Sequence, residues 1–154
     1  MAMKTIKELV KAILDGDGQL YEETGDVISL GTRGDNCYMS VKILCDDENQ
    51  MMSVLAGVEL IVPPDRKAAV LAVINELNAK NMFGSFSLSL ENRRVSCCCS
   101  CYSNAGALNG EVATVLIASV VSMLDEAYLP LMRARLGVQS EQVATDSGND
   151  EAAE

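Results

Sequence analysis

Residues 74–102, INELNAKNMFGSFSLSLENRRVSCCCSCY, decide the fold, because the spacing of apolar residues changes within them. Up to Asn81 the apolar residues recur at intervals of three and four, which predicts one face of a helix. The helix begins at Pro63-Pro64-Asp65, where a proline loses no helical hydrogen bond and an acid suits the positive end of the helix dipole. Its predicted inner face is Val70, Leu71, Ile74, Leu77 and Asn78.

After Gly84, which supplies backbone freedom for a reversal, apolar residues alternate with serine. Phe86, Leu88 and Leu90 then share one face of a strand. The polar turn at 91–93 leads to a return strand, so an antiparallel pair covered on one side by helices is predicted. The return strand has Val95, Cys97, Cys99 and Cys101 on one face and Ser96, Cys98, Ser100 and Tyr102 on the other.

Upstream of this stretch the pattern predicts one amphipathic helix and three strands. The helix covers 3–14, with Ile6, Leu9, Val10, Ile13 and Leu14 on its apolar face, and ends at Asp15-Gly16-Asp17-Gly18. The strands cover 20–30, interrupted around Gly25-Asp26, then 37–45, then 51–62. The third strand is the most apolar, so we expect it at the centre of the sheet.

A long helix is predicted from about Gly110, capped by Asn109 or Asn104. Pro130 predicts a kink or a restart, and Gly137 ends the helix after two arginines in the last turn. The predicted inner stripe is Val112, Leu116, Val120, Met123, Ala127 and Leu131, widened by Val115, Ser119 and Leu124.

The resulting order is α-β-β-β-α-β-β-α, an α+β fold with an antiparallel sheet of about five strands packed against helices. Residues 1–137 form a single domain at this length. Residues 138–154 contain five acidic residues and no basic one, and their small polar composition predicts a disordered acidic tail.

Composition excludes several classes of function. The chain has no histidine, which removes the commonest general base and the commonest metal ligand. Its net charge of -10 argues against nucleic acid as a partner, because phosphate binding needs clustered basic residues. No complete catalytic, cofactor or metal motif is present, so we expect no enzyme and no cofactor.

The chain shows no uninterrupted apolar segment of the export type near its start. Its longest uncharged apolar run, between Glu111 and Asp125, is shorter than the roughly 20 residues of a membrane span. We therefore expect a cytoplasmic protein with no membrane partner, and reduced thiols.

Two acidic turns raise the alternative of cation binding. Residues 15–18 lack the glycine and glutamate that a calcium loop needs downstream, so a helix stop is favoured. Asp46-Asp47-Glu48-Asn49 could hold a hard cation, but the same composition is typical of a solvated hairpin tip, which we favour.

The run 97–101, Cys-Cys-Cys-Ser-Cys, is the most unusual local feature. Cys98 and Cys101 have C-x-x-C spacing, but residues three apart in a strand point to opposite faces. Cys97, Cys99 and Cys101 share a face, with neighbours about 6.6 Å apart along the strand, too far for one tetrahedral ion. Small buried hydrophobes are the favoured interpretation, and a thiol sensor or soft-metal site is the alternative.

The chain resembles the YbjN family of bacterial proteins, described as sensory transduction regulators. The resemblance rests on Val62-Pro63-Pro64-Asp65-Arg66, on 74–78 running into Phe83-Gly84-Ser85-Phe86, and on Ala127-Tyr128-Leu129-Pro130-Leu131-Met132. It implies the fold of type III secretion chaperones, a small acidic domain that is often dimeric, and a binding or regulatory role without known chemistry. The cysteine run departs from the family pattern.

These observations favour a non-enzymatic module that binds a protein partner, or a second copy of itself, in bacterial signalling or stress regulation. A secretion chaperone is the alternative, and a thiol-based redox sensor is the third. Asn75, Asn78, Phe83 and Gly84 are the candidate binding residues. The competing interpretation is that the two asparagines satisfy backbone groups at the end of their helix.

Overall fold

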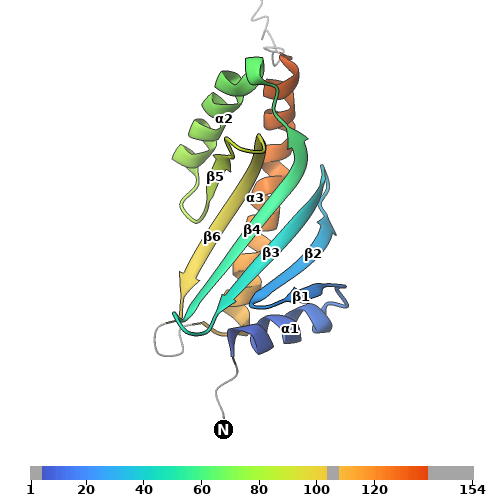
Figure 1. Cartoon of the computed structure of the whole chain (residues 1–154), viewed down its shortest axis with the longest axis vertical. Helices are drawn as coiled ribbons and strands as arrows, with labels where there is room; N and C mark the ends of the chain where they lie inside the picture. The colour runs from blue at the N-terminus through green and yellow to red at the C-terminus, as the bar shows by residue number, and fades with distance from the viewer. Residues whose placement is uncertain (1–4, 104–107, 139–154) are drawn as a thin grey trace, which may run out of the picture.

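The computed structural model describes residues 5–103 and 108–138, which form a six-stranded antiparallel sheet with helices on one face (Figure 1). The strand order is β1-β2-β3-β4-β6-β5. The elements along the chain are α1 (Ile6–Gly16), β1 (Glu22–Thr24), β2 (Val27–Arg33), β3 (Tyr38–Asp46), β4 (Met51–Ile61), the 3₁₀ turn η1 (Pro64–Arg66), α2 (Lys67–Lys80), β5 (Ser85–Leu88), β6 (Arg94–Tyr102) and α3 (Gly110–Leu136).

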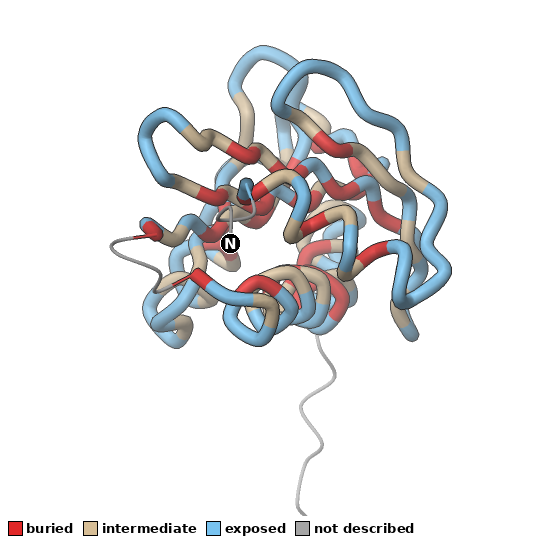
Figure 2. The backbone as a smooth tube through the Cα atoms, turned by 90° about the horizontal axis from the view of Figure 1, so that it is seen from below, coloured by how far each residue is buried: buried red, intermediate tan, exposed pale blue. Residues whose placement is uncertain are grey.

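The core lies between the inner face of the sheet and the helices, as Figure 2 shows by the red segments gathered there. In β3 and β4 every second residue is buried, which confirms the predicted alternation and the central place of β4. β6 alternates in the same way, with Val95, Cys97 and Cys99 buried. The α+β class predicted from the change of period is therefore confirmed.

The predicted first strand is a hairpin of two strands, which raises the count from about five to six. Gly25 has φ of 58° and turns the chain between β1 and β2, and Thr24 pairs with Val27 across the turn. The interruption seen in the sequence at Gly25-Asp26 is thus a full reversal. β1 is only three residues long and therefore covers only the first part of β2.

α1 is fixed at its N-terminal end by polar contacts. Thr5 and Glu8 form a reciprocal capping box, and the Ile6 N–H donates to Asp47 Oδ1 at 2.7 Å. Met3, where the helix was predicted to begin, lies outside the described residues. Asp46 accepts from the Asn49 backbone and side chain, so both aspartates of the 46–49 turn stabilise local structure.

α2 follows the prolines as predicted, but its inner face is narrower than the pattern indicated. Val70 and Ile74 are buried, whereas Leu71 is 40% exposed. β5 likewise stops at Leu88, so Leu90, predicted to share its apolar face, is exposed. Spacing alone predicted that both leucines face inward. Leu71 is exposed because α2 is packed on one side only, and Leu90 is exposed because β5 ends before it.

α3 runs along the whole helix layer, with Asn109 as its N-cap and Gly137 in the left-handed conformation at its end. Asn104, the other predicted cap, lies outside the described residues. The helix continues through Pro130, so the predicted restart does not occur; Pro130 is at an exposed position. The buried face confirms four predicted residues, Val120, Leu124, Ala127 and Leu131. It is rotated from the predicted stripe near the start of the helix, where Ala113 is buried, and it also includes Asp125.

The rotation exposes apolar residues on the outer side of α3. Val112 and Val115, both predicted to face inward, are 36% and 57% exposed. By length and composition α3 could cross a bilayer, as some core helices of soluble proteins also could, although the uncharged run from 112 to 124 is shorter than a span. Of its most apolar window only 28% is buried. The predicted acidic tail, apart from Val138, lies outside the described residues.

Candidate binding surface

The edge of β2 beyond β1 is unpaired in the part of the chain that the structure describes. β1 pairs with 27–29 of β2, and no described strand pairs with the same side of Leu30–Arg33. The Gly34 N–H donates to the Cys37 carbonyl at 2.9 Å, so the alternation of an antiparallel ladder directs the backbone groups of Gly31 and Arg33 away from β3. An incoming strand could pair with these groups.

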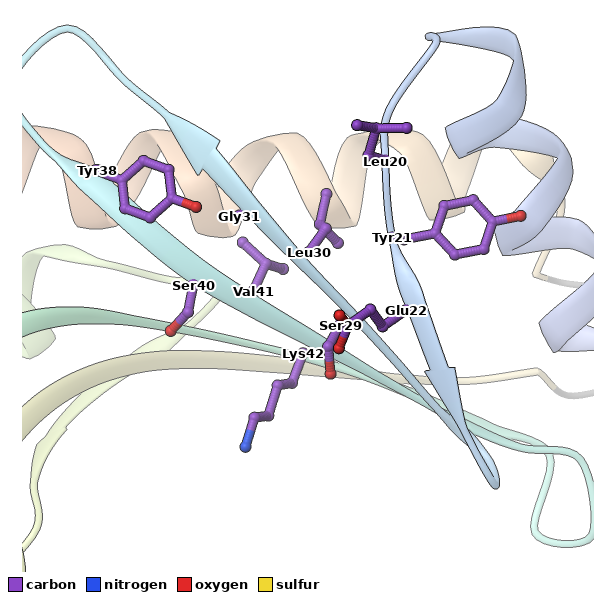
Figure 3. Close-up of a pocket in the computed structure, with 10 residues that line it drawn as sticks. All are labelled: Leu20, Tyr21, Glu22, Ser29, Leu30, Gly31, Tyr38, Ser40, Val41 and Lys42. Atoms are coloured by element: carbon purple, nitrogen blue, oxygen red, sulfur yellow. The ribbon is translucent and has the colours of Figure 1, made fainter.

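A hollow of about 530 Å³ lies beside this edge (Figure 3). Leu20 and Tyr21, from the segment before β1, stand across it from Leu30. Leu20 is 91% exposed, which is unusual for a leucine. The Tyr38 hydroxyl lies over Gly31, where a Cβ atom would overlap it. The remaining lining residues are Glu22, Ser29, Ser40, Val41 and Lys42.

Asp125 of α3 fixes the turn at the far end of β2. Its carboxylate accepts from the successive backbone N–H groups of Asp35, Asn36 and Cys37 at 3.1, 2.9 and 3.1 Å. The Asn36 amide donates to the same carboxylate at 3.1 Å, and the Cys37 thiol lies 3.6 Å from it. A Cβ atom on Gly34 would overlap the carboxylate. The backbone bonds, led by that from Asn36, lower the pKa of Asp125.

Sequence reasoning missed Asp125, although one signal was available. The residue ends an uncharged run on α3 and lies between two apolar positions that the structure buries, Leu124 and Ala127. A carboxylate at such a position is rarely buried without donors. The donors come from a turn about 90 residues earlier, and no local pattern could have named them.

The opposite edge of the sheet is closed by Asn78. Its Oδ1 accepts from the Phe86 N–H at 2.7 Å, and its Nδ2 donates to the Phe86 carbonyl at 3.0 Å. The amide of one side chain therefore occupies both outward backbone groups of Phe86 on edge strand β5. The competing interpretation had Asn78 satisfying backbone groups at the end of its helix; it does satisfy backbone groups, but they lie on β5.

The other candidate residues have different surroundings. Asn75 is exposed, and the structure does not bring it together with Asn78 in one site. Phe83 is 79% exposed, and its carbonyl accepts from the Cys99 thiol at 2.7 Å. Gly84 is tightly packed, because a Cβ there would lie 3.0 Å from the Cys98 carbonyl oxygen and 3.1 Å from Met123 Cε.

The six thiols are free, and most of them are shielded. Burial raises the pKa of Cys97 to about 12, and it raises the pKa of Cys99 as well. Cys45 and Cys37 have their pKa raised to about 11, chiefly by burial. A raised pKa keeps a thiol protonated and unreactive at neutral pH. Cys101 is half-buried on the face of Cys97 and Cys99, as the alternation predicted.

The described residues contain no group of three or more Cys, Asp or Glu side chains placed to hold a metal ion. In the acidic turn at 46–49, Asp46 accepts a hydrogen bond from the Asn49 N–H, and Asp47 accepts one from the Ile6 N–H at the start of α1. The thiols of Cys97, Cys99 and Cys101 lie along one strand, at spacing set by the sheet. The clearest binding feature of this geometry is thus the open edge of β2.

Comparison with known proteins is consistent with this architecture. The model of the YbjN family, described as "Putative bacterial sensory transduction regulator", matches residues 7–131. The crystal structure of YbjN from E. coli, titled as a "putative transcription regulator", is similar with a TM-score of 0.58 and 16% identity, covering 80% of this chain and 87% of that one.

A second solved structure, of an uncharacterized protein from Methanothermobacter thermautotrophicus, is similar with a TM-score of 0.54 and 14% identity. It covers 84% of this chain and 98% of the other. No curated protein sequence matches. At these identities the two structures support the fold alone.

Proposed function

The chain belongs to the YbjN family, and on that premise we propose that it is a non-enzymatic regulatory module that binds an extended segment of a partner protein. The segment adds as a strand to the open edge of β2, in line with β1. The observation that carries the proposal is that the outward backbone groups of Gly31 and Arg33, beside the hollow at Leu20, have no partner among the described residues. Strand addition obtains affinity from main-chain hydrogen bonds and specificity from neighbouring pockets.

The chemistry of the edge indicates what kind of segment fits. Leu20, Tyr21 and Leu30 offer apolar contacts to an added strand, and Glu22 and Lys42 add one charge of each sign beside them. Tyr38 over Gly31 limits the space on the outer face, so a small residue is expected opposite it. The partner segment is therefore extended and partly apolar, and we place the module in the cytoplasm.

Arg33→Pro tests this proposal most directly. Proline removes the outward N–H of residue 33 and tolerates a strand backbone, whereas the bonds from β2 to β3 come from neighbouring residues and remain. The matched control is Arg33→Ala, which removes the same charged side chain and keeps the N–H. Peptides selected from a displayed library on the wild-type protein are then titrated against all three proteins by calorimetry.

We expect Arg33→Pro to weaken binding at least tenfold and Arg33→Ala to weaken it far less, because the backbone donor carries the interaction. Equal loss in both variants would assign binding to the arginine side chain and contradict strand addition. Full binding by the proline variant, with its fold verified by circular dichroism, would place the segment elsewhere on the molecule.

A further inference from the structure

Half of the basic residues of the chain gather at one end of the molecule, where β4 and α3 end and α2 begins (Figure 1). We call this surface the basic end; it consists of Arg66, Lys67, Arg93, Arg94, Arg133 and Arg135, out of twelve Lys and Arg residues in all. The ends of the same elements contribute three acidic residues, Glu59, Asp65 and Glu91. The basic end is thus locally positive in a chain whose net charge is -10.

The segment that links β4 to α2 brings the parts of the basic end together. Arg135 Nε of α3 donates to the Ile61 carbonyl at 2.8 Å, and Ile61 pairs with Arg94 in the sheet. The Val62 N–H donates to the Arg93 carbonyl at 2.9 Å. The last turn of α3, the turn between β5 and β6 and the start of α2 therefore meet at one place, although they are far apart in the sequence.

Arg66 lies against the end of the described chain. A Cβ atom on Gly137 would overlap the Arg66 guanidinium, so the arginine occupies the space that this glycine leaves open. Gly137 has φ of 73° and ends α3, and Val138, the last described residue, is 58% exposed. The segment 139–154 therefore starts next to the guanidinium of Arg66.

Most cations of the basic end have no carboxylate partner within residues 5–103 and 108–138. Two of the six, Arg66 and Arg94, are in exposed ion pairs there. The other four have none in these ranges, and among them Lys67, Arg93 and Arg133 are exposed. Like charges gathered in this way repel one another, so an anion bound among them is stabilised.

We propose that the segment 139–154 of the same chain binds across the basic end and covers its cations. This segment has five acidic residues and no basic one: Glu141, Asp146, Asp150, Glu151 and Glu154. Glu141 follows Val138 by three residues, and an extended chain spans about 3.5 Å per residue, so the first acid reaches the basic end directly. Single exposed ion pairs contribute little, whereas several charges acting together on one segment contribute more.

Attachment and charge select this segment over a separate anionic partner. Because it is joined to α3 beside Arg66, its effective concentration at the basic end is on the order of millimolar. A separate polyanion such as nucleic acid is repelled by the net charge of -10 and has to displace the attached acids. The contact is therefore autoinhibitory for anionic ligands. It lies apart from the open edge of β2 and does not depend on the proposed function.

Nuclear magnetic resonance of the full chain tests the proposal. We expect the amide signals of 139–154 to shift as sodium chloride rises from about 20 mM to about 500 mM, because salt screens the contact. Lys67→Gln with Arg133→Gln should reduce this salt-dependent shift by about twofold or more, since two cations that face the segment are removed. The matched control is Lys42→Gln with Lys80→Gln, which removes the same charge from exposed positions outside the basic end and should leave the shift unchanged.

A second variant approaches the contact from the other side. Replacing the five acids of 139–154 by their amides keeps the length of the segment, and it should move the side-chain Nε–Hε signals of Arg66 and Arg133 toward their high-salt positions. Signals that respond to neither set of substitutions overturn the proposal, as does an equal response to the control. A salt-dependent shift that grows with protein concentration overturns it in favour of contact between copies. Binding of heparin that is equally tight with and without the five acids overturns it in favour of an external polyanion.

Discussion

The two edges of the sheet end in different ways, and the difference bears on the proposed addition of a strand at β2. At β5 the outward groups of Phe86 are occupied by the amide of Asn78. At β2 a three-residue strand covers the start of the edge and leaves Gly31 and Arg33 unpartnered within the described residues. An unpaired edge invites pairing by another chain, and proteins usually block it. Here one side chain occupies the outward groups of Phe86, whereas no described group occupies those of Gly31 and Arg33.

The open edge is also supported from the helix layer. Asp125 binds three successive N–H groups of the turn that ends β2, and thereby attaches the free end of the edge to the longest helix. A strand edge held in place before binding costs less conformational entropy when a segment adds to it. The comparison therefore makes Asp125 a positioning residue for the edge.

Asp125→Ala should cause the largest loss of stability among the variants that probe this comparison. The substitution removes the buried carboxylate that accepts from the three N–H groups of the turn, and it detaches the end of β2 from α3. We expect a lower Tm and faster amide exchange at 35–37. Asp125→Asn is the control, because its amide oxygen still accepts, and it should lose less. Unchanged amide exchange in the alanine variant would show that contacts within the turn itself, and not Asp125, hold the turn in place.

Asn78→Ala should open the closed edge. The substitution removes both bonds to Phe86, and we expect it to lower the free energy of unfolding by about 1–3 kcal/mol, measured by urea denaturation. It should also increase self-association seen by light scattering, because the edge strand is then free to pair. The exposed Asn75→Ala is the control and should change stability by less than about 0.5 kcal/mol. Equal effects of the two substitutions would contradict the assigned role.

Glu23→Gln should have the smallest effect and tests how firmly β1 covers the start of β2. Bonds from Lys11 and Lys7 lower the pKa of Glu23 to about 2, from an unfolded value of 4.5. A lowered pKa means that the stabilisation is present above about pH 4.5 and is lost as the pH falls toward 2. The wild-type Tm should decline through this window.

The glutamine variant should show a shallower decline, with only a small difference at neutral pH, because exposed ion pairs contribute little. Thermal scans from pH 2 to 7 measure both curves. If the variant declines as steeply as the wild type, the acid sensitivity arises at another group, for which Asp125 is the first candidate, since its pKa is also lowered.

Much of the fold followed from local pattern, because burial on one side imposes a period that the chain shows directly. The period change near Gly84 predicted α2 followed by a hairpin, and the alternation in 94–102 correctly assigned Cys97 and Cys99 to the inner face. The errors occur where neighbouring faces of one helix are both apolar, so that spacing alone does not decide which face is buried. On α3 the predicted stripe is buried at Val120, Ala127 and Leu131, but near the start of the helix packing buried Ala113 and left Val115 outside.

The binding surface was less predictable from the sequence. Asn78 was a candidate because of its place at a helix end, but its partner Phe86 became evident only when α2 was packed beside β5. Asp125 and the unpaired edge depend on contacts between residues far apart in the chain. The resemblance indicated a family and a regulatory role, without the surface that performs it.

The sequence by itself determined the three helices and most of the strands with the faces they bury, because those follow from periods of about four and two residues. Only the tertiary structure decided which backbone groups are left without partners. That outcome depends on strand order, on the short length of β1 and on two side chains, Asn78 and Asp125, that reach across the molecule. A hydrogen bond between distant segments has no period, so it leaves no repeating mark in the sequence.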